Sequence, residues 1–153
     1  MSKTRKTWRE KLEVEQEPKV VDDPRGRGKM LIPVPLDVDA LIRRVERGKL
    51  VTDKQIRGKL ARNFHADLTC PMTTGIFIRT AAEAAEEDLR NGMEEITPYW
   101  RVIKADGSLN EKFPGGVEVQ AAHLKEEGHT IEPGKGKKPP RVKDFEEHLQ
   151  RLL

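Results

Sequence analysis

The segment 97–103, TPYWRVI, constrains the fold of this 153-residue chain more than any other stretch. Pro98 restricts the backbone at its start, and the apolar residues at its end favour an extended run. Asp106-Gly107 then predicts a turn, and the run Phe113-Pro114-Gly115-Gly116 predicts a second one. The segment is therefore a short connection that surrounding elements must hold in place.

Helical patterns lie on both sides of this connection. Apolar residues recur at helical spacing, and the patterns begin at capping residues such as Thr52 and end at glycines such as Gly48 and Gly128. The predicted helices cover 37–47, 53–62, 74–89 and 117–127. A short strand is expected at 101–104. The sequence therefore predicts a mostly α domain with a small β wing.

The connection also resembles the active-site motif of the alkylguanine-DNA alkyltransferases and of the non-enzymatic alkyltransferase-like proteins. That motif is Pro-Cys-His-Arg-Val, followed by a glycine turn, a Gly-Gly loop and a helix ending in Glu-Gly. Pro98, Arg101 and Val102 match it, whereas Tyr99 replaces the alkyl-accepting Cys and Trp100 replaces the His. The resemblance covers about residues 35–132 and implies a winged helix-turn-helix-like single domain.

The two replacements bear directly on activity. Alkyl transfer requires a sulfur nucleophile with a lowered pKa and a base beside it. Tyrosine has an ordinary pKa of about 10, and tryptophan offers one N–H donor and no base. We therefore expect no catalytic residue and no enzyme activity. Cys70, the one cysteine, is an alternative nucleophile by position, but a lone cysteine is usually a small buried apolar residue.

The resemblance implies two sets of site residues. The base-pocket set is Pro98, Tyr99, Trp100, Arg101, Phe113, Gly115, Gly116 and Glu127. The DNA-binding set is Thr52, Lys54, Gln55, Arg57, Arg79 and Asn91. The family's base-flipping Tyr is Asp53 here, so that role does not carry over.

Two alternatives remain open at this point. Tyr99 and Trp100 line a pocket that receives a base, such as an alkylated guanine in duplex DNA, or they fill the core. The protein binds DNA, or it is an interaction or scaffold protein that kept the fold and lost DNA binding. Two features favour the second function. Asp53 replaces the base-flipping Tyr, and the acidic second half of the helix 74–89 would repel phosphates if it faced a DNA groove.

Composition and charge complete the expectations. Charged residues make up 36% of the chain and the net charge is +3, with basic residues concentrated near both ends. We expect a flexible basic arm and linker at 1–29, in which residues 4–13 form a short helix with Trp8 and Leu12 on one face. The alkyltransferase-like domain is expected at 30–133, and a basic linker with a short C-terminal helix at 134–153. That helix would dock on the domain or bind a protein partner. The sequence predicts no membrane span, no cofactor and no metal site, and a single cysteine suits a cytoplasmic location.

Overall fold

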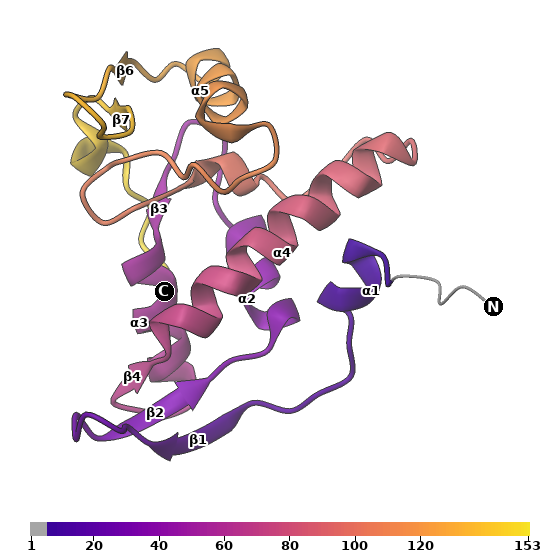
Figure 1. Cartoon of the computed structure of the whole chain (residues 1–153), viewed down its shortest axis with the longest axis vertical. Coiled ribbons are helices and arrows are strands. Elements are labelled where there is room, and N and C mark those ends of the chain that lie inside the picture. The colour runs from indigo at the N-terminus through magenta and orange to yellow at the C-terminus, as the bar shows by residue number, and fades with distance from the viewer. Residues whose placement is uncertain (1–5) are drawn as a thin grey trace.

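The computed structural model describes residues 6–153 and contains five α-helices, short strands and two 3₁₀ helices (Figure 1). The α-helices are α1 (Trp8–Leu12), α2 (Pro35–Arg43), α3 (Asp53–Asn63), α4 (Pro71–Arg90) and α5 (Gly116–Glu126). The strands are β1 (Lys19–Asp22), β2 (Lys29–Ile32), β3 (Val51–Thr52), β4 (Leu68–Thr69), β5 (Val102–Ile103), β6 (Ile131–Glu132) and β7 (Arg141–Val142). The 3₁₀ helices are η1 (Tyr99–Arg101) and η2 (Phe145–His148).

Helix α4 is the central helix of the fold, and α1, α2, α3 and η1 pack against it (Figure 1). Small residues on α4 make close packing possible, because Ala81, Ala82 and Ala85 are fully buried. They share one core with apolar residues of α2 and α3, including Ile42 and Ile56. A second, smaller core lies between α5, β5 and the C-terminal segment.

The predicted helices are present, with changes at their ends. Thr52 caps α3 as expected, since its hydroxyl accepts from the Gln55 N–H and the Gln55 side chain accepts from the Thr52 N–H. Helix α2 begins earlier than predicted, because Pro35 suits a first helical position and Val34 precedes it as the cap. Helix α4 likewise starts at a proline, Pro71.

The strands form three small sheets rather than one. Strand β1 pairs antiparallel with β2, and β2 pairs parallel with β4. Strand β3 pairs parallel with β5, which ties the start of α3 to the end of the 97–103 connection. Strands β6 and β7 form an antiparallel pair beside α5. A mostly α, winged helix-turn-helix-like domain with a small β wing is confirmed.

The N-terminal segment differs from the flexible arm expected at 1–29. From Trp8 onward it folds onto the domain, where Leu12 is fully buried and β1 pairs with β2 over its whole length. Burial of Leu12 against α4 supplies free energy that composition alone does not reveal. The first five residues of the expected arm lie outside the described residues.

The C-terminal segment also differs from the expectation of a short α-helix at the end of 134–153. It forms only η2 and then continues extended, so that Leu149 bridges to Leu50 and the Gln150 N–H donates to the Leu50 carbonyl. Leu152 is buried in the main core. The segment therefore docks on the domain, which is one of the two roles expected for this end of the chain.

Candidate nucleic-acid interface

Tyr99 lies inside the protein. Its side chain is fully buried, and its ring meets those of Trp100 and Phe113 edge-on at centroid distances of 5.4 and 5.3 Å. The Tyr99 hydroxyl donates to Glu86 of α4 at 2.5 Å. Burial, and next this carboxylate, raise the pKa of the Tyr99 phenol far above its ordinary value. Tyr99 is thus a neutral core residue.

Trp100 and Arg101 serve a buried ionic network centred on Glu127. The Trp100 Nε1–H donates to Glu127 at 2.8 Å, and Arg101 donates to both of its carboxylate oxygens through Nε and Nη2 at 2.9 Å or slightly more. The Gly48 N–H adds a third donor at 3.1 Å. Burial opposes ionisation of Glu127, but these hydrogen bonds outweigh it and hold the pKa below its usual value. On its other side the Trp100 ring stacks on His123 at 4.1 Å.

The loop 113–116 covers this cluster. Phe113 is buried against Tyr99, and Pro98 is buried at the start of η1. Gly115 has φ +78°, and a Cβ there would lie 2.3 Å from Cγ2 of Val119, so this position requires glycine. Gly116 then begins α5. The structure therefore brings the whole predicted base-pocket set together, but as a packed cluster and not as the wall of an open pocket.

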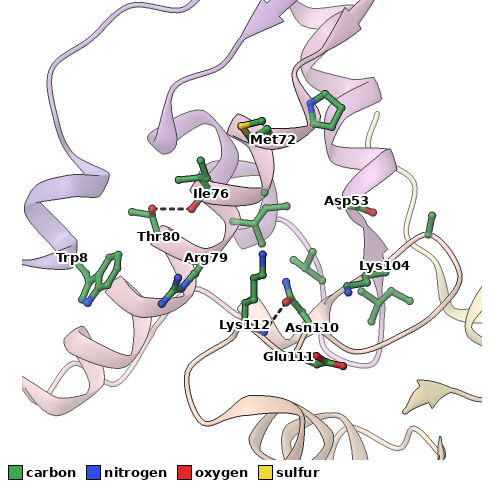
Figure 2. Close-up of a pocket in the computed structure, with 16 residues that line it drawn as sticks. Trp8, Asp53, Met72, Ile76, Arg79, Thr80, Lys104, Asn110, Glu111 and Lys112 are labelled. Carbon is green, nitrogen blue, oxygen red and sulfur yellow. Dashed lines mark hydrogen bonds between the residues drawn. The ribbon is translucent and has the colours of Figure 1, made fainter. Parts of the chain in front are cut away.

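An open cavity of about 600 Å³ lies next to this cluster, along the first half of α4 (Figure 2). One wall is α4, from Pro71 to Thr80, and the facing wall is the segment from Val102 to Lys112. Trp8 lies at one end and Asp53 at the other. The volume falls within the roughly 300–1,000 Å³ typical of ligand pockets.

The walls are apolar and the rim carries positive charge. Met72 and Ile76 are 75% and 55% exposed, which is unusual for large apolar side chains on a helix. Arg79, Lys104 and Lys112 supply three cations, and Asp53 and Glu111 supply two carboxylates. The Lys112 N–H donates to Oδ1 of Asn110 at 2.9 Å, which holds that amide at the wall.

The predicted DNA-binding residues are only partly gathered at this cavity. Arg79 lines it, and Lys54 is exposed beside Asp53 on the first turn of α3. The other members have structural roles or lie elsewhere. Thr52 and Gln55 cap α3, Gln55 also donates to the Gln150 carbonyl, Arg57 lies 3.9 Å from Asp53, and Asn91 follows the last turn of α4.

The acidic second half of α4 faces the protein. Glu86 accepts from Tyr99, and Glu87 accepts from the backbone N–H groups of Trp8 and Arg9, both at 3.0 Å. Asp88 is buried in an ion pair with Arg9. These carboxylates are therefore used internally, and they do not line the cavity.

Cys70 precedes α4 and does not line the cavity either. Burial raises the pKa of its thiol, but hydrogen bonds from Thr73 and from the Met72 backbone outweigh this effect and lower it. The Thr73 hydroxyl lies 3.2 Å from the sulfur. Within the described part of the chain, no group of three His, Cys, Asp or Glu residues is placed to hold a metal ion.

The fold is similar to that of a solved protein. A crystal structure of Schizosaccharomyces pombe Atl1 in complex with damaged DNA containing O6-carboxymethylguanine covers 77% of this chain and 94% of its own, with a TM-score of 0.52 and 18% sequence identity. A second structure, of the S. pombe ATL protein with DNA, covers the same shares with a TM-score of 0.47 and 18% identity. No protein-family model and no curated protein sequence matches the chain. At this identity the first likeness establishes the shared fold.

Sequence reasoning assigned Arg79 to the DNA interface but missed most of the other residues that line the cavity. Trp8, Met72, Ile76, Lys104 and Lys112 belong to no family motif, and a local signal exists only for Met72 and Ile76, in the spacing of apolar residues on α4. Met72 and Ile76 are four residues apart, so they lie on one helix face, and neither is needed for the buried stripe. No helix among residues 6–153 is long and apolar enough to cross a membrane.

Proposed function

We propose that this protein binds duplex DNA without catalysis and holds an alkylated guanine base in the cavity along α4. The observation that carries the proposal is the cavity itself, which combines apolar walls with a cationic rim. It lies in a fold similar to that of a protein solved with DNA containing O6-carboxymethylguanine.

The lining matches the parts of a nucleotide. Met72 and Ile76 offer exposed apolar surface to the flat face of a base, and Asn110 offers an amide to its polar edge. Arg79 and Lys112, on opposite walls, suit the phosphates on either side of a displaced nucleotide. Arg79 is 51% exposed and lies 4.0 Å from Glu83, a weak pairing that leaves it available.

The absence of alkyl transfer follows from the cluster behind the cavity. Tyr99 is buried and its pKa is raised, so the phenolate nucleophile is not formed at neutral pH. Trp100 donates its single N–H to Glu127 and supplies no base. The base is therefore bound and released unchanged.

The direction of the acidic residues favours DNA binding over a scaffold role. The main argument for a scaffold was repulsion between phosphates and the second half of α4. Glu86 and Glu87 instead accept hydrogen bonds from Tyr99 and from α1, and Asp88 pairs with Arg9, so these carboxylates are engaged within the fold and do not line the cavity. The first half of α4, which contains no acidic residue before Glu83, is the half that lines the cavity.

The experiment is a binding titration at several salt concentrations with duplexes that do or do not carry one O6-carboxymethylguanine. The test variant replaces Arg79 and Lys112 with Ala, and the matched control replaces Lys19 and Lys125, two exposed lysines that do not line the cavity. Each lost phosphate contact should flatten the log–log salt dependence by about 0.9 in the test variant alone. Equal slopes in the two variants, or no binding by the wild type, would refute the proposal.

A further inference from the structure

The cavity contains one aromatic residue, and it is not in the motif that sequence reasoning assigned to the base. Tyr99 and Phe113 are buried and Trp100 is stacked on His123, so none of them lines the cavity. Trp8 of α1 does, at the end near Arg79 (Figure 2). A stacking surface for a base is therefore available only from the N-terminal segment.

Specific contacts hold Trp8 in this place. Glu87 accepts from the backbone N–H groups of Trp8 and Arg9, and the Arg9 side chain pairs with the buried Asp88. Leu12, one turn further on, is fully buried in the core. A short helix of five residues has little stability alone, so tertiary contacts must supply it.

The surroundings of the Trp8 ring are positively charged. The Lys11 ammonium lies 4.2 Å from the ring centroid, and the Arg79 guanidinium carbon lies 6.0 Å from it. The ring is half-buried, so part of its surface is accessible. An aromatic surface flanked by cations is the combination that proteins use to hold an unpaired base and its phosphates.

We propose that Trp8 is the base-stacking residue of the cavity, and that α1 is the element that presents it. The displaced base enters between α4 and the segment 102–112 and stacks on Trp8, while Lys11 and Arg79 neutralise its phosphates. This inference rests on the proposed function, because it assigns the residue that recognises the base in the same cavity.

The test compares Trp8→Leu with Trp8→Phe. Leucine keeps apolar contact with α4 and removes the aromatic face, whereas phenylalanine keeps a smaller aromatic face. Affinity for a duplex carrying one O6-carboxymethylguanine should fall about tenfold or more in Trp8→Leu and clearly less in Trp8→Phe. Affinity for the undamaged duplex should not change. The wild-type tryptophan emission should be quenched by the damaged duplex, and Trp8→Leu should lose that quenching.

The outcomes separate this inference from the function it rests on. A wild type that prefers the damaged duplex, with Trp8→Leu retaining both that preference and the quenching, overturns the role of Trp8 and leaves the proposed function standing. A wild type without any preference contradicts both. The melting temperatures of the two variants should agree within a few degrees, because both replace a half-buried side chain. A difference in affinity between them then reflects the aromatic face and not a difference in folding.

Discussion

At the scale of single residues, the same motif position can serve chemistry or packing, and its surroundings decide which. Tyr99 lies at the position that holds the nucleophilic Cys in the alkyltransferase motif. Its burial and its hydrogen bond to Glu86 nevertheless make it a core residue. Trp100 and Arg101 likewise hold Glu127 in place and present nothing to the cavity. The motif survives here as a structural support for the segment that lines the cavity.

Replacement of Tyr99 by Ala should therefore affect stability and not base selectivity. Removing a fully buried aromatic side chain costs about 3–5 kcal/mol of unfolding free energy through lost burial and a cavity. Tyr99→Phe, which removes only the hydroxyl bonded to Glu86, should cost about 1 kcal/mol. Chemical denaturation measures both values. A near-neutral Tyr99→Ala variant that binds damaged duplex more weakly would contradict the core role.

Glu127 gives the protein a defined response to acid. Its pKa is lowered in the folded state, so its contribution to stability is present above the ordinary carboxyl pKa of about 4.3 and is lost as the pH falls through the folded value. Protonation would leave Arg101, whose side chain is 13% exposed, without its partner. Glu127→Gln should be less stable than the wild type at pH 7 by about 3 kcal/mol and should lose less stability between pH 5 and 3. Parallel acid-limb curves for the two proteins would contradict this assignment.

At the scale of elements, the ends of the chain could not be predicted from composition. The helices α3, α4 and α5 were predicted because caps and apolar spacing are local signals. The docking of α1 depends on Glu87 and Asp88, almost eighty residues away, and the C-terminal segment depends on Leu50 and Gln55. Long-range partners of this kind leave no periodic pattern in the sequence. Likewise, no local signal distinguishes a buried Tyr99 from one that lines a pocket.

The docking of α1 predicts a large effect of Leu12→Ala. This leucine is fully buried in the main core, so its truncation should lower the unfolding free energy by about 2–5 kcal/mol. Val14, two residues further on and 36% exposed, is the matched control, and Val14→Ala should stay within about 0.5 kcal/mol of the wild type. Thermal melting of both variants tests this. Equal melting temperatures would mean that α1 is not part of the folded core.

Under the proposed function, the basic hairpin at 134–143 is a second element that would contact phosphates. Its exposed cations are Lys135, Lys137, Lys138, Arg141 and Lys143, and none forms an ion pair with a described residue. Hydrogen bonds from Leu109 to the Pro140 carbonyl and from Val142 to the Gly107 carbonyl join it to the segment that lines the cavity. The hairpin therefore lies behind one wall of the proposed DNA site.

Neutralising Lys135, Lys137 and Lys138 as glutamines should weaken binding to damaged and undamaged duplexes by the same factor. Contacts to phosphates carry no information about the base, so the selectivity should stay constant while the salt dependence flattens. Neutralising the same number of exposed cations outside the hairpin, namely Lys19, Lys49 and Lys125, is the control. A variant with unchanged affinity and slope would show that the hairpin only increases solubility.

At the scale of the whole molecule, different residues stabilise the fold and line the cavity. The buried cluster of Tyr99, Trp100 and Glu127 fixes one wall, and the acidic half of α4 fixes α1. Between them, α4 presents the exposed apolar side chains of Met72 and Ile76, and three cations outnumber two carboxylates in the cavity lining. The fold class could be predicted from the sequence, whereas this cavity required the three-dimensional arrangement of α1, α4 and the segment 102–112.

The most direct test of the proposed function is the ratio of affinities for damaged and undamaged duplex, measured in the wild type and in Gly75→Phe. Gly75 lines the cavity from the exposed face of α4. Apart from its chain neighbours and the surrounding helix backbone, no atom lies within 4 Å of a Cβ added there, so a phenyl group can enter the cavity without disturbing the core. We predict a wild-type preference of about tenfold or more for the O6-carboxymethylguanine duplex. In Gly75→Phe this preference should vanish while affinity for undamaged duplex stays nearly the same. A preference that survives the blocked cavity, or a wild type that binds both duplexes equally, would contradict the proposal.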